Sequence, residues 1–124
     1  MEINKEPKAK FTIESYDAES ITIQTKKYTS STLVSKNNIE TNWDVQKITD
    51  LNADNIQTIL ALNPEIIIIG HFLADKQIPI DIRALLAKQR IGIESMSVGA
   101  ACRTFNILLS ENRNVVYAYI KERT

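Results

Sequence analysis

The run Glu-Ile-Ile-Ile-Ile-Gly over residues 65–70 constrains the fold more than any other feature. Side chains along a strand point alternately to its two faces, and these four consecutive isoleucines make both faces apolar. Both faces of this strand must therefore be covered. Strands of this kind belong to parallel or mixed sheets that carry helices on each side. Pro64 precedes the run and ends the element before it.

Helical and strand patterns alternate from residue 52 onward. Asn52 is placed to cap a first helix, and a second helix follows Pro79 with Asp81 near its start. Ile91–Glu94 is a short strand, a third helix covers 98–109, and Val115–Ile120 is the last strand. The order α-β-α-β-α-β predicts crossover connections and a parallel or mixed central sheet, hence the α/β class.

The N-terminal part reads as antiparallel. Phe11–Ile13 and Ile21–Ile23 alternate apolar and polar residues around a polar turn, which predicts a half-buried β-hairpin. Further strands are expected near 28–34 and 39–43, extending or covering the sheet. We expect residues 1–10 to form a flexible tail and residues 11–124 a single domain.

Charge and cysteine content exclude several classes of function. Lys+Arg and Asp+Glu both number 15, so the basic excess that non-specific nucleic-acid binding needs is missing. Cys102 is the single cysteine, which excludes an intrachain disulfide and a Cys-only zinc site and suits a cytoplasmic location. No apolar stretch follows Met1, and the longest apolar run is too short to cross a membrane.

No phosphate-binding loop, dinucleotide fingerprint or nucleophile elbow is present. Cys102 falls on the apolar face of the third helix, which indicates a small buried residue rather than a nucleophile. His71 follows the buried strand, and ligands of α/β sheets collect at the carboxyl ends of strands. The alternative is a loop histidine that makes one backbone hydrogen bond.

The third helix separates into two stripes. Its core stripe is Val98, Cys102, Phe105 and Leu109, whereas Gly99, Arg103 and Asn106 share another face. Gly99 leaves the first-turn amides open, and Arg103 lies one turn later, so this strip is able to hold a carboxylate or phosphate. In the alternative, Gly99 permits close packing, Arg103 pairs with an acid, and Asn106 ties down a loop.

This helix carries a family resemblance. Its residues 100–106, Ala-Ala-Cys-Arg-Thr-Phe-Asn, together with Met96, Leu108, Glu111 and Arg113, resemble the signature of the Mth-type domain of unknown function. That family includes the mitochondrial complex I assembly factor three and an adipogenesis-associated protein. The resemblance runs from about Phe11 to Ile120. It implies a three-layer α/β fold with a mixed central sheet, no settled enzymatic activity, and, for the mitochondrial relatives, assembly through protein contacts.

Two departures from the family pattern are visible. Gly70-His71-Phe72 stands where the family has Gly-Thr-Gly, which puts two bulky rings beside any cleft. Asn112 stands where the family has glycine, and asparagine also tolerates the left-handed conformation of a helix end.

We therefore predict a non-catalytic interaction or assembly-type factor with a protein partner, no cofactor, no metal, no nucleic-acid partner and no membrane insertion. The alternative is a small-molecule, anion-binding protein or an unrecognised enzyme. Its predicted ligand-binding residues are those that the strand ends and the third helix bring together: Gly70, His71, Met96, Ser97, Gly99, Arg103 and Asn106.

Overall fold

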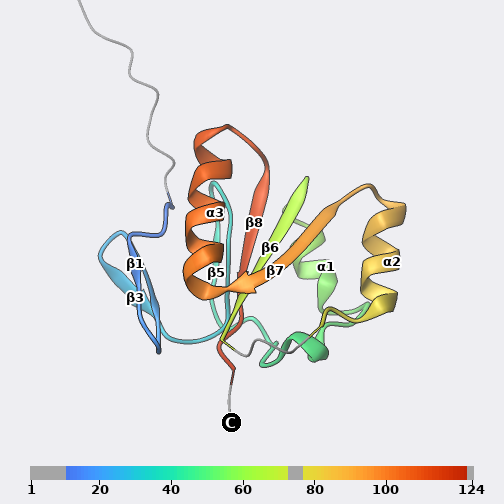
Figure 1. Cartoon of the computed structure of the whole chain (residues 1–124), viewed down its shortest axis with the longest axis horizontal. Coiled ribbons are helices and arrows are strands. Elements are labelled where there is room, and N and C mark those ends of the chain that lie inside the picture. The colour runs from blue at the N-terminus through green and yellow to red at the C-terminus, as the bar shows by residue number, and fades with distance from the viewer. Residues whose placement is uncertain (1–10, 73–76, 123–124) are drawn as a thin grey trace, which may run out of the picture.

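The computed structural model describes residues 11–72 and 77–122, and within these ranges the predicted α/β order is confirmed (Figure 1). The predicted tail over 1–10 lies outside the described residues. The elements are β1 (Ser15–Tyr16), β2 (Ile21–Ile23), β3 (Lys26–Tyr28), β4 (Thr32–Val34), β5 (Ile39–Glu40), the 3₁₀-helix η1 (Ile48–Asp50), α1 (Ile56–Leu60), β6 (Ile66–His71), α2 (Ile80–Lys88), β7 (Gly92–Ser97), α3 (Val98–Ser110) and β8 (Val115–Tyr119).

The larger sheet is mixed and has β6 near its centre. Its strand order is β5-β4-β8-β6-β7, with β6 parallel to both β7 and β8, and β4 antiparallel to β8 and β5. Ile67 and Ile69 pack on one face of this sheet and Ile68 on the other. Two apolar faces explain why the run in β6 shows no polar alternation.

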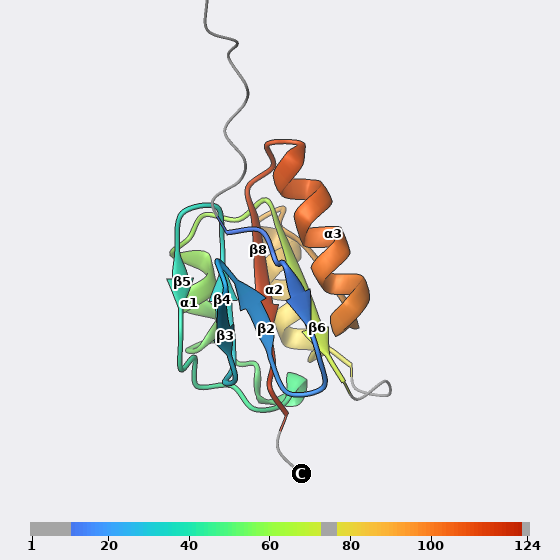
Figure 2. The same cartoon turned by 90° about the vertical axis from the view of Figure 1, so that its left-hand side faces the viewer.

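Three layers result, as the family resemblance implies. α1 and α2 cover one face of the five-stranded sheet, whereas α3 and the small sheet β1-β2-β3 lie side by side on the other face (Figures 1 and 2). Each face has its own buried cluster. Trp43, Ile48, Ile59 and Leu86 belong to the first, and Ile21, Val98, Phe105 and Tyr117 to the second.

α3 has well-defined ends. The Ser97 side chain accepts a hydrogen bond from the Ala100 amide at 3.4 Å, as expected of an N-cap serine. Asn112 follows the helix with φ of 61°, so its predicted left-handed conformation is confirmed. Arg113 then bonds Glu65 at 3.0 Å, and that carboxylate also accepts from the Asn114 amide. These bonds fix the chain between α3 and β8 beside the start of β6.

The N-terminal hairpin exists, but its first strand is later than predicted. β1 comprises Ser15 and Tyr16 rather than 11–13, because Ile13 is held by the side chain of Asn106 and not by a strand. The segment expected as one strand over 28–34 is also divided. β3 completes the small sheet, and β4 enters the large one.

Candidate functional site

The carboxyl ends of β6 and β7 bring four of the seven predicted site residues together. Gly70 is aligned with Met96, and His71 with Ser97. α3 begins directly after β7, so Gly99 follows within the first helical turn. The remaining two, Arg103 and Asn106, lie further along α3.

His71 is not a loop residue. It is the last residue of β6 and only 5% exposed, and its Nδ1 atom is buried without a hydrogen-bond partner among the described residues. The interpretation as a loop histidine with one backbone hydrogen bond is therefore wrong. The strand continues through this position because the paired strand β7 extends to Ser97.

Both glycines of the predicted cleft face aromatic rings. A side-chain carbon at Gly70 would lie 2.7 Å from Cε1 of Tyr117, a residue of β8. A side-chain carbon at Gly99 would lie 2.8 Å from Cζ of Tyr16, which reaches over the start of α3 from the hairpin. The spaces that the two missing side chains leave are thus occupied by tyrosines, and close packing accounts for both glycines.

Asn106 and Arg103 share a helix face but differ in their environment. Asn106 Oδ1 accepts from the Ile13 amide at 2.8 Å, and its Nδ2 donates to the Ile13 carbonyl at 2.9 Å. Asn106 therefore ties the N-terminal segment to α3. Arg103 is exposed and forms no ion pair within the part of the chain that the structure describes.

The Cys102 thiol and the Tyr117 hydroxyl form a buried polar pair between α3 and β8. Cys102 is 4% exposed, and its Sγ lies 3.7 Å from the hydroxyl of Tyr117. Burial raises the pKa of the Cys102 thiol, with Tyr117 and Arg103 acting weakly in the opposite direction. Burial also raises the pKa of Tyr117 well above its usual range and that of Tyr119 to about 12. A protonated, enclosed thiol is a poor nucleophile, and Cys102 is the buried residue that its helix face predicts.

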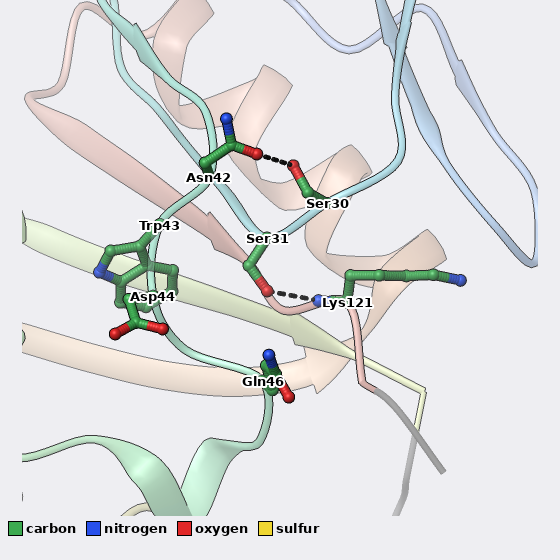
Figure 3. Close-up of a pocket in the computed structure, with 7 residues that line it drawn as sticks. All are labelled: Ser30, Ser31, Asn42, Trp43, Asp44, Gln46 and Lys121. Atoms are coloured by element: carbon green, nitrogen blue, oxygen red, sulfur yellow. Dashed lines mark hydrogen bonds between the residues drawn. The ribbon is translucent and has the colours of Figure 1, made fainter.

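A pocket of about 180 Å³ opens elsewhere, at the ends of β4 and β8 (Figure 3). The Ser31 hydroxyl organises it by donating to the Val45 carbonyl and accepting from the Lys121 amide at 2.9 Å. Ser30 donates to Asn42 Oδ1 at 3.3 Å. The pocket is lined by Ser30, Ser31, Asn42, Trp43, Asp44, Gln46 and Lys121.

The charges of this pocket are unevenly placed. The Lys121 ammonium is directed away from the other lining residues and bonds Glu19 at 2.8 Å, so Asp44 is the charge left at the rim (Figure 3). The buried Trp43 Nε1 has no partner among the described residues and lies on the side of the ring away from Ser31 (Figure 3). Sequence spacing gave no sign of this pocket, because the antiparallel pairing of β4 with β8 assembles it.

No three His, Cys, Asp or Glu side chains lie close enough to bind a metal ion within residues 11–72 and 77–122. Residues 13–120 match a family model described as a protein of unknown function (DUF498/DUF598). The chain belongs to this family. The DUF498/DUF598 match spans nearly the same residues as the Mth-type resemblance, which the comparisons confirm.

Two curated proteins are similar in sequence to the DUF498/DUF598 chain. The 13 kDa major membrane protein of Francisella tularensis subsp. holarctica is 38% identical over 73 residues, covering 57% of this chain and 58% of that protein. The NADH dehydrogenase [ubiquinone] 1 alpha subcomplex assembly factor 3 of Drosophila melanogaster is 30% identical over 82 residues, covering 63% of this chain and 42% of that protein. The chain thus spans less than two thirds of either relative.

Solved structures share the fold. An NMR structure of a Xanthomonas campestris protein has a TM-score of 0.82 at 27% identity, over 97% of this chain and 92% of that one. A Bordetella pertussis protein described as an Mth938-like domain has a TM-score of 0.70 at 24% identity, over 100% and 95%. The α/β Mth-type architecture is therefore established for the DUF498/DUF598 chain.

The name of the Francisella relative raises the question of membrane contact. None of the helices in the described ranges has both the length and the apolar character needed to cross a membrane.

Proposed function

We propose that this chain is a non-catalytic interaction factor that works by binding another protein. The observation that carries the proposal is its 30% identity to the Drosophila assembly factor over 82 residues. An assembly factor acts through protein contacts, and the matched segment is more than half of this chain.

The geometry of the predicted cleft supports the proposal. Tyr117 and Tyr16 fill the spaces beside its two glycines. The Asn106 side chain is hydrogen-bonded to the backbone amide and carbonyl of Ile13. These groups therefore stabilise packing between α3 and its neighbours. Large apolar side chains are exposed instead at Ile80 and Ile107, at 84% and 57%. The two isoleucines lie on α2 and α3, which cover opposite faces of the sheet, so each is a separate candidate contact for a partner.

Affinity purification of a tagged chain from its native cells, with and without crosslinking, tests the proposal. We expect one protein to copurify in near-stoichiometric amount and to migrate with the chain on size exclusion. Ile80→Glu and Ile107→Glu are matched surface variants, because neither side chain is buried. At least one should lose the partner while its urea unfolding midpoint is unchanged. Repeated recovery of the chain alone, crosslinked or not, would refute an interaction role.

Arg103 supports a second candidate, a small-anion site at the start of α3. Its guanidinium is exposed and without an ion pair among the described residues, and it matches carboxylate or phosphate oxygens bidentately. Tyr16 covers Gly99, so a bound anion would have to displace the phenol or bond to it. Titration of phosphate, sulfate and small carboxylates into wild type and Arg103→Lys tests this candidate. Wild type that binds none of them at tens of millimolar rules it out.

We further propose that residues 11–124 act as one domain in the cytoplasm and have no nucleic-acid partner. The free, buried thiol of Cys102 suits a reducing compartment, and the balanced charge disfavours nucleic acid. Cell fractionation tests the location. Recovery of the chain in the membrane pellet, resistant to high salt, would contradict it.

A further inference from the structure

Among the described residues, β7 is an edge strand of the five-stranded sheet, with β6 as its one neighbour. The Gly92 amide donates a hydrogen bond to the Glu65 carbonyl, so the backbone groups of Gly92 face β6. Along a strand of a parallel pair, the N–H and C=O groups of successive residues point alternately toward the paired strand and away from it. The backbone groups of Ile93 and Ser95 therefore point away from the sheet. Within the described ranges, neither residue makes a backbone hydrogen bond on that side.

This edge differs from the opposite edge of the same sheet. β5 is two residues long, whereas β7 has six. Proteins usually protect a long edge with proline, bulges or several charges, since unpaired backbone groups recruit other strands. β7 contains no proline, its register with β6 is unbroken, and Glu94 is its one charged residue.

The side chains beside the edge form a defined strip. Met96 is half-buried and lies 3.5 Å from the Thr104 hydroxyl, so α3 flanks this side of β7. Glu94 is on the same face of β7 as Met96, is exposed, and forms no ion pair among the described residues.

We propose that β7 accepts an extended segment of a partner protein as a sixth strand of the sheet. The outward groups of Ile93 and Ser95 supply the main-chain hydrogen bonds of strand addition. The segment carries Lys or Arg opposite Glu94, since opposite charges stabilise cross-strand pairs. Two positions away it carries a bulky apolar residue that packs beside Met96. This inference rests on the proposed interaction function and names its surface.

A second copy of the chain fits the edge less well. Antiparallel pairing of two β7 strands about Ser95 places Glu94 opposite the apolar Met96 of the copy. Pairing about Glu94 places two carboxylates opposite each other, which is destabilising. Neither arrangement provides a cation for Glu94, so the chemistry of the edge favours a different sequence.

A phage-displayed library of random octapeptides, selected on the full chain, supplies the probe. We expect enriched peptides that alternate apolar and polar residues and contain Lys or Arg, measured afterwards as synthetic peptides by calorimetry. Ser95→Pro removes an outward N–H that the sheet itself does not use, and edge strands tolerate proline there. Peptide affinity should fall at least tenfold in Ser95→Pro. Ser95→Ala keeps the N–H and should bind as wild type.

Two further readouts keep the proposal testable if Ser95→Pro folds poorly. Glu94→Lys should shift the selected peptides from basic to acidic ones, and bound peptide should slow hydrogen exchange of the Ser95 amide. Peptides that bind Ser95→Pro and wild type equally would overturn the edge proposal and leave an interaction function in place. A selection that enriches no peptide also overturns it. Copurification of a native partner tests the interaction function separately.

Discussion

Phe105→Ala tests the assignment of the core face of α3. The ring is fully buried and packs against Tyr117 with 5.7 Å between ring centroids. Truncation of a buried phenylalanine costs about 3–5 kcal/mol, of which the aromatic pair accounts for about 0.5–1.5 kcal/mol. With an unfolding entropy of about 2.1 cal/mol/K per residue, the loss lowers Tm by roughly 12–19 °C.

Urea unfolding followed by tryptophan fluorescence measures this loss. Trp43 is the single tryptophan and belongs to the buried cluster on the opposite face of the sheet, so its signal reports unfolding of the whole structure and not the substitution itself. Ile107→Ala is the matched control on the same helix, because that side chain is 57% exposed, and it should cost about 0.5 kcal/mol or less. A Phe105→Ala loss below about 1 kcal/mol would refute the packing argument.

Three further predictions follow from buried contacts. Gly70→Ala should destabilise the fold by about 1–3 kcal/mol in urea, because the methyl group overlaps the Tyr117 ring, and an unchanged midpoint would contradict this packing. Asn106→Ala should cost about 1–3 kcal/mol and speed hydrogen exchange of the Ile13 amide, and unchanged exchange would show that the bond is not maintained. Burial raises the pKa of Tyr119 to about 12, so its hydroxyl stays protonated in the folded state at pH values where the unfolded state has lost this proton. The free energy of unfolding should therefore fall as the pH rises from 10 to 12. Tyr119→Phe should reduce this alkaline loss, and an identical pH profile would show that the hydroxyl does not titrate as described.

The sequence predicted the parallel half of the fold well because its signals are local. The isoleucines of β6 and the amphipathic pattern of α3 each lie within one element, and each predicts burial without knowledge of its neighbours. The small sheet was harder to predict. Its β2–β3 turn uses Gln24 and Thr25 with positive φ, whereas the usual signal is Asn-Gly, so β3 could not be separated from β4.

The candidate site shows a similar limit. Spacing along α3 predicts that Gly99, Arg103 and Asn106 share one face, but it contains no information about what covers that face. Tyr16 and Ile13 reach it from a segment about ninety residues earlier in the chain. The pocket beside Ser31 likewise depends on pairing between β4 and β8, which no local pattern encodes.

The position of β8 has a consequence for how the protein is made. β8 is the last strand in sequence, yet it lies between β4 and β6 and joins the antiparallel and parallel halves of the sheet. Until residues 115–119 have left the ribosome, β4 and β6 both have an unpaired edge, and the nascent chain exposes apolar strands of the kind that aggregate. Chaperones that bind near the tunnel exit therefore have a defined interval in which to act on this chain. The interval ends when β8 pairs with β4 and β6.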